Sequence, residues 1–208
     1  MNIKVEGQGS KGVVVLSHGA GMPMDHAYLN GISIALVALG LKVVRFEFPY
    51  MNERRVNGKK KFPDKMPVLE QCFSDVIAYV RKYHMAEGAP LYLAGKSLGG
   101  RVATLVADRL LVKAVFVLGY PFHPIGKPEK LRVEHLSTIS TPVYIFQGER
   151  DKFGCKEEVV GYLLGKKVSV HWLGDGDHDL VPRVRSGFSF EQHLSTLSQV
   201  IRTVVHKD

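Results

Sequence analysis

Short apolar runs alternate along the whole chain with longer segments whose apolar residues recur at helical spacing. Within each run Val, Ile, Leu and Phe occupy consecutive positions, which is typical of strands buried on both faces of a parallel sheet. These runs lie at residues 12–17, 41–48, 90–94, 113–118, 142–147 and 167–173. The expected helices lie at about 26–39, 68–86, 98–110, 155–164 and 190–205. We therefore predict an α/β fold with a mostly parallel, doubly wound sheet and helices on both faces.

Length and composition fit one domain with a sizeable core. The chain has 208 residues, 45% of them hydrophobic and 23% charged, with no internal repeat or linker, so we expect a single domain over residues 1–208. No apolar run is long enough to span a membrane, and the N-terminal segment lacks the apolar stretch of a secretory signal. Cys72 and Cys155 make neither a disulfide framework nor a metal-ligand pattern. We therefore expect a reducing, cytoplasmic location.

The charge is uneven, and the densest basic segment lies between two predicted elements. The net charge is +8, and residues 53–65 hold six Lys or Arg against two acidic residues. No zinc-finger spacing, aromatic-rich RNA motif or helix-turn-helix pattern accompanies them, so we expect no nucleic-acid partner. Residues 49–67 are predicted to form an irregular basic loop, which is either solvated or bound to an anionic substrate. Nucleic-acid binding through this loop is a third, weaker alternative.

The stretch G-K-S-L-G-G, residues 95–100, lies between a predicted strand and a predicted helix. In a nucleophile elbow the backbone turns so sharply that side chains two positions before and after the serine would collide, which accounts for Gly95 and Gly99. The turn also directs the helix N-terminus at a developing oxyanion. A lone G-x-S-x-G is a weak signal, because about one chain in ten of this composition would contain it by chance, so the prediction depends on its placement between strand and helix. The alternative is that Ser97 only caps the helix.

Further candidate residues follow the later strands, whose carboxyl ends share one edge of a parallel sheet. A serine hydroxyl is a weak nucleophile without a base, and the base needs an acid to orient it. His178 lies in G-D-G-D-H-D after the last predicted strand, and Asp151 lies in G-E-R-D after the one before. We predict Ser97 as nucleophile, His178 as base and Asp151 as acid. Glu149 is the alternative acid and His123 the alternative base.

The oxyanion hole needs a second donor besides the backbone N–H of Leu98. The turn H-G-A-G, residues 18–21, offers the N–H of Ala20, with Gly21 as the alternative; a plain glycine turn is the other interpretation. Lys96 adds a charge beside the predicted nucleophile. The candidate substrate-binding residues are Tyr50, Arg54, Arg55 and His123. The arginines would suit a small acyl substrate with a carboxylate or phosphate, and the alternative is that they only solubilise the surface.

Several of these stretches together resemble an α/β-hydrolase over nearly the whole chain. The resemblance is greatest to the small dienelactone-hydrolase-like branch found in bacteria, which is related to testis-expressed hydrolase-like proteins. It is carried by S-H-G-A-G, R-F-E-F-P-Y-M, G-K-S-L-G-G-R, G-Y-P-F-H-P, G-E-R-D-K-F-G and G-D-G-D-H-D-L. It implies Ser97, Asp151 and His178 as the triad and Ala20 and Leu98 as oxyanion donors.

The chain departs from that family pattern in two ways. Dienelactone hydrolases proper have cysteine at the elbow, whereas this chain has Ser97, so lactone chemistry does not carry over. There is also little room for the full N-terminal hairpin or for a lid domain, which makes the expected fold a minimal one. No metal or organic cofactor is implied.

We therefore expect a serine hydrolase that cleaves an ester or thioester of a small acyl substrate through an acyl-enzyme. The alternative is a catalytically quiet α/β-hydrolase fold that serves as a binding or scaffold protein, because a fold does not settle a function. An intact Ser, Asp and His set favours the enzyme, since a scaffold has no need of it.

Overall fold

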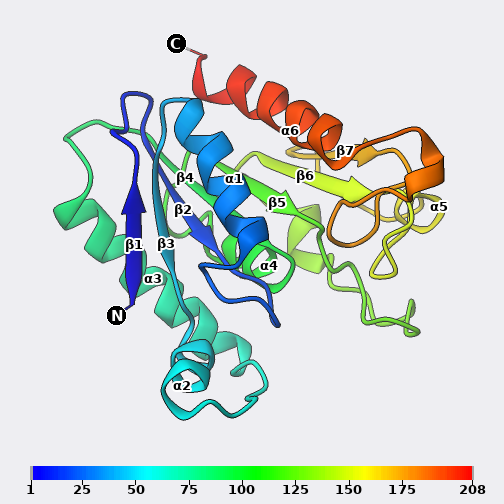
Figure 1. Cartoon of the computed structure of the whole chain (residues 1–208), viewed down its shortest axis with the longest axis horizontal. Coiled ribbons are helices and arrows are strands. Elements are labelled where there is room, and N and C mark those ends of the chain that lie inside the picture. Colours follow the sequence, from blue (N-terminus) through cyan, green and yellow to red (C-terminus); the bar gives the residue numbers. More distant parts are fainter. Residues whose placement is uncertain (1, 208) are drawn as a thin grey trace.

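A seven-stranded sheet forms the centre of the computed structural model, which describes residues 2–207 (Figure 1). The spatial order is β1-β3-β2-β4-β5-β6-β7, and every neighbouring pair is parallel except β1 with β3. The strands are β1 Ile3–Glu6, β2 Val13–Ser17, β3 Lys42–Phe46, β4 Leu91–Lys96, β5 Ala114–Leu118, β6 Val143–Gly148 and β7 Val168–Leu173. The chain moves from β2 to β3 in one direction and from β3 to β4 in the other, so successive crossovers place helices on opposite faces.

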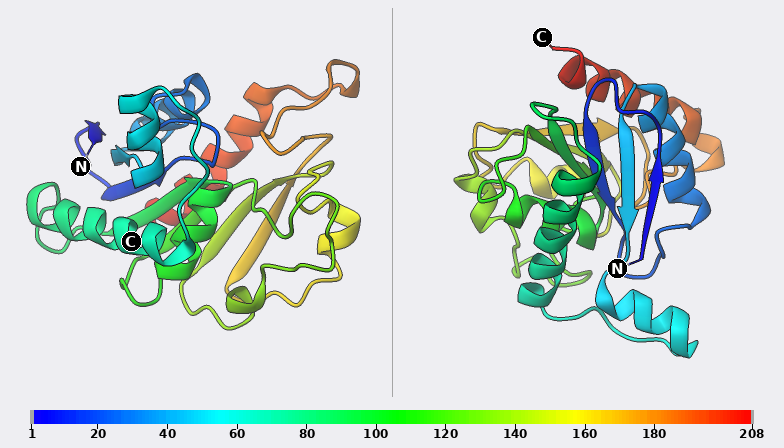
Figure 2. Two further views of the ribbon diagram at one scale, coloured as in Figure 1. Left: turned by 90° about the horizontal axis from the view of Figure 1, so that it is seen from below. Right: turned by 90° about the vertical axis from the view of Figure 1, so that its left-hand side faces the viewer.

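Helices cover both faces of this sheet, as the sequence predicted. In Figures 1 and 2, α1 and α6 lie on one face and α3 and α4 on the other. The helices are α1 Ala27–Ala38, α2 Pro49–Asn57, α3 Met66–Tyr83, α4 Leu98–Val106, α5 Lys156–Val159 and α6 Phe190–Val205. Two short 3-10 helices, η1 Glu134–Ser137 and η2 Val184–Ser186, complete the set. Within residues 2–207 no separate group of helices forms a lid domain.

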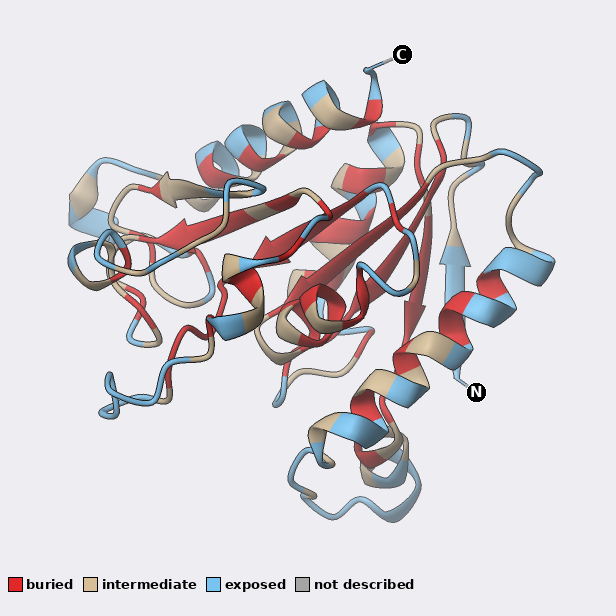
Figure 3. Ribbon diagram, turned by 180° about the vertical axis from the view of Figure 1, so that it is seen from behind, coloured by how far each residue is buried: buried red, intermediate tan, exposed pale blue. Residues whose placement is uncertain are grey.

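Two apolar cores lie on either side of the sheet and explain the continuous apolar runs. Successive strand side chains point to opposite faces, so Val15 and Val117 pack in the core under α3 and α4. Val14 and Phe116 pack in the core under α1 and α6. The central strands are buried along their whole length in Figure 3. A polar residue within such a strand therefore has to find a hydrogen-bond partner inside the protein.

The segment 49–67 differs from the irregular loop expected from its composition. Residues Pro49–Asn57 form α2, and α3 already begins at Met66. Proline fits the first helical position because its φ is preset and the missing N–H has no partner there anyway. Gly58 ends the helix in the left-handed conformation, at φ +64°. Pro49 thus both ends the extended strand segment and starts a helix.

Two other helices and one edge strand also differ from the sequence-based expectation. The helix expected over 155–164 is a single turn, and the one expected over 98–110 ends at Val106. The edge strand Ile3–Glu6 was not predicted, because it is only half-buried and has no apolar run. Within the part of the chain that the structure describes, no helix is both long and apolar enough to cross a membrane.

Candidate active site

The turn from β4 into α4 has the geometry of a nucleophile elbow. Ser97 has φ +51° and ψ −114°, a strained conformation for a residue with a side chain. A Cβ on Gly95 would lie 2.5 Å from Ser17 Oγ, and a Cβ on Gly99 would lie 2.5 Å from the carbonyl oxygen of His18. The predicted steric need for both glycines is therefore confirmed. Ser97 makes no side-chain capping hydrogen bond to α4, so the capping alternative is wrong.

Ser97, His178 and Asp151 form one continuous chain of hydrogen bonds. Ser97 Oγ lies 2.8 Å from His178 Nε2, and His178 Nδ1 lies 2.7 Å from Asp151 Oδ2. A carboxylate can only accept, so Nδ1 carries the imidazole proton and the Nε2 lone pair faces the serine hydroxyl. The three side chains come from the loops after β4, β7 and β6, at the carboxyl edge of the sheet. Their predicted convergence is confirmed by these distances.

The carboxylate of Asp151 is fully buried and is held by three donors. Besides His178, Gln147 Nε2 and the backbone N–H of Phe153 each donate to it at 2.8 Å. Hydrogen bonds to the charged form offset the cost of removing a carboxylate from water. Gln147 was not singled out from the sequence. The sequence feature that could have identified Gln147 is its position as a polar residue at the end of the apolar run P-V-Y-I-F-Q.

The two alternative residues are engaged elsewhere. Glu149 Oε1 pairs with Lys156 Nζ at 2.7 Å, and this hydrogen bond lowers the pKa of Glu149. His123 is buried, with Nε2 3.2 Å from a carboxylate oxygen of Glu158. Neither Glu149 nor His123 has a side-chain hydrogen bond to Ser97, His178 or Asp151. The geometry therefore favours Asp151 and His178.

The turn that carries Ala20 is fixed by two side chains beneath it. His18 Nδ1 donates to the carbonyl oxygen of Gly19 at 2.7 Å, and the Tyr50 hydroxyl lies 3.2 Å from the carbonyl oxygens of both Gly19 and Ala20. The N–H of Leu98, at the first position of α4, has no acceptor within the helix. Rigid amides at this edge are what an oxyanion hole requires.

His18 was not assigned a role from the sequence, although it lies within the quoted S-H-G-A-G motif. It is fully buried, and its Nε2 accepts a 3.1 Å hydrogen bond from the N–H of Phe48. Burial lowers its pKa to about 4. His18 is therefore a neutral imidazole near pH 7 that joins the Ala20 turn to the end of β3.

Lys96 lies beneath the elbow rather than in solvent. Its side chain is only 2% exposed, and its Nζ lies 2.7 Å from the carbonyl oxygen of His178 and 3.2 Å from Asp179 Oδ1. Burial lowers the pKa of Lys96, and the carboxylate of Asp179 acts in the opposite direction. Lys96 thus connects the strand before Ser97 with the loop that carries His178.

A pocket of about 400 Å³ opens over Ser97. Its walls are the turn 19–22, His26, the pair Lys96 and Ser97, Phe153, and the pair His178 and Asp179. Phe153 packs on the imidazole of His178, with ring centroids 4.3 Å apart.

The structure does not bring the four predicted substrate-binding side chains into this pocket. Tyr50 is buried under the Ala20 turn, and His123 faces Glu158. Arg55 binds the buried carboxylate of Glu47 and also Asp25, with an Nη2 to Oδ1 distance of 2.6 Å for the second pair. Arg54 lies on α2 outside the pocket wall.

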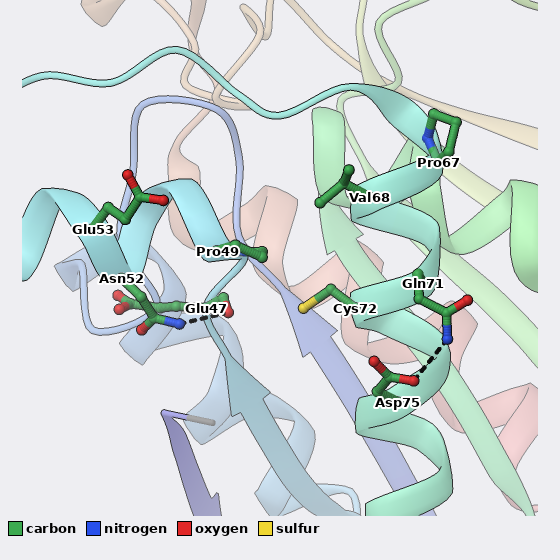
Figure 4. A pocket seen from close by; sticks show the side chains of 9 residues that line it. All are labelled: Glu47, Pro49, Asn52, Glu53, Pro67, Val68, Gln71, Cys72 and Asp75. Atoms are coloured by element: carbon green, nitrogen blue, oxygen red, sulfur yellow. Dashed lines mark hydrogen bonds between the residues drawn. The ribbon is translucent and has the colours of Figure 1, made fainter.

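A larger cavity of about 700 Å³ lies between α2 and α3 and shares no residue with the pocket over Ser97 (Figure 4). Pro49, Asn52, Val68 and Cys72 are among its lining residues. It contains neither a histidine nor a serine, so the position of the candidate site follows from side-chain geometry and not from cavity size.

The mostly parallel seven-stranded sheet with helices on both faces is the fold of a minimal α/β-hydrolase. The chain belongs to the alpha/beta hydrolase domain family, whose sequence model matches residues 10–206. Solved structures show the same fold. Est1E from Butyrivibrio proteoclasticus, bound to ferulic acid, has 16% identity and a TM-score of 0.76, with 99% of this chain and 96% of that chain covered.

Two further structures are similar over nearly their whole length. A lidless α/β serine hydrolase from Xanthomonas campestris has 21% identity and a TM-score of 0.70, with 98% of this chain and 87% of that chain covered. A dienelactone hydrolase from Anabaena variabilis has 16% identity and a TM-score of 0.71, with 97% and 90% covered. At these identities the likeness establishes the fold.

Proposed function

We propose that this protein is a serine hydrolase that cleaves an ester or thioester of a small acyl substrate. The main support for this proposal is the continuous set of hydrogen bonds from Ser97 Oγ through the His178 imidazole to the buried Asp151 carboxylate. The strained elbow that presents the serine supports the same reading, because strain persists where the surrounding structure enforces a working geometry. Membership of a hydrolase family agrees with it.

The proposed reaction has two halves. Ser97 Oγ attacks the acyl carbon while His178 Nε2 takes its proton, and the carbonyl electron pair moves onto oxygen. The N–H groups of Ala20 and Leu98 stabilise that oxyanion. When it collapses, the imidazolium protonates the leaving alcohol or thiol. A water molecule, deprotonated by His178, then attacks the acyl-enzyme. When this second intermediate collapses, the imidazolium returns the proton to Ser97 Oγ and the carboxylic acid leaves. Asp151 keeps the imidazole in the required tautomer throughout.

The size and the charges of the pocket fit a small substrate that does not need to carry a negative charge. A volume of about 400 Å³ suits a compact acyl group, and Phe153 offers it an apolar wall. The one lysine in the wall, Lys96, is paired with Asp179, and Arg55 is bound to acidic residues elsewhere. We therefore propose that neutral and anionic acyl compounds of equal size are accepted alike.

Labelling with a fluorophosphonate probe tests the proposal. The wild-type protein should be modified once, at Ser97, and should hydrolyse p-nitrophenyl acetate. Ser97→Ala should lose both properties while keeping its unfolding transition, with a rate loss of at least about 10³-fold. A folded wild-type protein that neither reacts with the probe nor turns over esters would instead support the binding or scaffold alternative.

A further inference from the structure

A second hollow, of about 520 Å³, lies on the flank of α4 away from the pocket over Ser97. It is bounded by α4 on one side and by residues 131–138, which include η1, on the other. Arg101, Arg132 and His135 provide its basic lining, and Leu105 and Leu131 its apolar lining. It shares no residue with the pocket over Ser97.

Two arginines in this hollow have no carboxylate partner. Neither Arg101 nor Arg132 forms an ion pair among residues 2–207. Elsewhere in the molecule Arg45, Arg55 and Arg109 each bind a carboxylate oxygen at 3.0 Å or less. The two unpaired guanidinium groups are also half-buried, so water does not fully solvate them.

One of these side chains carries an unsatisfied buried donor. Arg101 Nε is shielded from solvent and has no hydrogen-bond partner within residues 2–207. Such groups are rare in folded proteins, because an unpaired buried donor costs free energy. Because this Nε is closed to solvent, a ligand in the hollow would contact Arg101 through its terminal Nη groups.

The charges in the hollow repel one another. Burial and the neighbouring charge of Arg101 together lower the pKa of Arg132. The same two causes lower the pKa of His135 to about 4, which leaves its imidazole neutral near pH 7. The only acidic side chain in the lining is Glu134, which is exposed and unpaired within residues 2–207. A ligand with negative charge would relieve this repulsion.

We propose that this hollow binds the phosphate group of an organic phosphate monoester. Guanidinium groups present paired N–H donors that match phosphate oxygens, and a dianion balances two arginines. The hollow is larger than a phosphate needs, and Leu105 and Leu131 offer apolar contact to the organic part. Arg101 lies one turn after Ser97 on α4, its N–H donating to the Ser97 carbonyl oxygen at 3.0 Å, so the ligand is held by the helix that starts at the elbow.

Titration of the full-length protein with phenyl phosphate and with inorganic phosphate, by calorimetry, tests this proposal. Phenyl phosphate should bind saturably and about fivefold or more tighter than inorganic phosphate, because only the monoester contacts the leucines. Arg101→Gln and Arg132→Gln should each weaken binding about tenfold, the usual effect of losing one charge-assisted contact. Arg185→Gln is the matched control, since Arg185 is exposed and lies outside the hollow, and it should bind like the wild type.

Two further measurements test phosphate binding in the hollow independently of the proposed catalysis at Ser97. Ser97→Ala should bind phenyl phosphate with unchanged affinity, because the hollow does not include Ser97. Without ligand, Arg101→Gln or Arg132→Gln should raise the melting temperature, because each removes one of two repelling charges. Absence of saturable binding to the folded wild type, an equal loss of affinity in Arg185→Gln, or loss of binding in Ser97→Ala would each overturn the proposal.

Discussion

The side-chain ammonium of Lys96 donates a hydrogen bond of 2.7 Å to the main-chain carbonyl oxygen of His178. The residue before the proposed nucleophile thus holds the backbone of the proposed base. Asp179, the residue after that base, supplies the counter-charge at 3.2 Å. The elbow and the His178 loop are therefore joined by an ion pair between the buried Lys96 and the exposed Asp179, in addition to the hydrogen bond between Ser97 and His178.

Replacing this connection should slow turnover without abolishing it. In Lys96→Met the His178 loop loses its buried anchor, and a displacement of about 1 Å at a reacting group can cost about 10²-fold in rate. We expect kcat for p-nitrophenyl acetate to fall about 10- to 100-fold, and the rate of fluorophosphonate labelling to fall in parallel. Lys113→Met, at an exposed position before β5, is the control. Wild-type kinetics in a folded Lys96→Met variant would contradict this role.

The choice of acid can be tested with two amide substitutions. Asp151→Asn should lower kcat about 10⁴-fold, because an amide donor beside His178 Nδ1 favours the tautomer whose Nε2 cannot accept the serine proton. Glu149→Gln should keep activity near wild type, since Glu149 pairs with Lys156. Steady-state kcat values of the two variants test this choice. A large loss of kcat in Glu149→Gln with little change in Asp151→Asn would identify Glu149 as the acid.

The elbow glycines should not tolerate even a methyl group. A Cβ on Gly95 would meet the backbone of Gly99 and Gly100 and the hydroxyl of Ser17. We expect Gly95→Ala to lose more than about 3 kcal/mol in its free energy of unfolding, or to be insoluble, because backbone cannot move aside cheaply. Gly31→Ala, in α1 with open space around its Cβ position, should be neutral or stabilising by up to about 1 kcal/mol. Denaturant unfolding of the two variants gives the comparison, and an equally stable Gly95→Ala protein would contradict the steric account.

Acid should destabilise the protein before most carboxylates titrate. Burial lowers the pKa of His18 and of His135 to about 4, below the 6.5 of an unperturbed imidazole. Between these values the unfolded chain binds protons that the folded protein does not, so the free energy of unfolding falls as the pH falls through this window. A difference of one bound proton corresponds to a slope of at most about 1.4 kcal/mol per pH unit for His18.

Urea unfolding between about pH 7.5 and about pH 5 measures that slope. The slope should be reduced in His18→Asn and in His135→Gln. It should be unchanged in His206→Gln, whose histidine is exposed after α6. A free energy of unfolding that stays constant over this range would show that these imidazoles titrate normally.

Arg55 should matter for stability and not for substrate affinity. Its partner Glu47 has a fully buried side chain, so Arg55→Ala leaves a buried carboxylate with weaker compensation. We expect the free energy of unfolding to fall by about 1–3 kcal/mol and KM to stay the same for neutral and anionic esters of equal size. Arg54→Ala, on the same helix, should change neither quantity. A KM that rises only for the anionic ester in Arg55→Ala would restore the substrate-binding role predicted from the sequence.

The sequence alone determined the fold and the main features of the elbow. Continuous apolar runs such as V-V-V-L require burial on both faces, which a parallel sheet between helix layers provides. The elbow follows from three residues that are close in the chain, Gly95, Ser97 and Gly99. The folded structure adds to the steric constraint, because a Cβ on either glycine would also meet Ser17 at the end of β2. Strand-end loops share an edge in such a sheet, and this placed Asp151 and His178 near Ser97.

Only the tertiary structure distinguished candidate residues that occupy equivalent positions in the sequence pattern. Glu149 and Asp151 both follow β6, yet one meets Lys156 and the other meets His178, because the outcome depends on which loop packs above each carboxylate. The anchoring contacts of His18 and Lys96 join segments that are far apart in sequence, and no local periodicity encodes them. Likewise the composition of residues 53–65 showed that this segment is basic, but it did not show which acidic groups its side chains bind. For Arg55 these are Glu47 and Asp25. Ion pairs and buried hydrogen bonds are set by three-dimensional proximity, and that is why they appear only in the folded molecule.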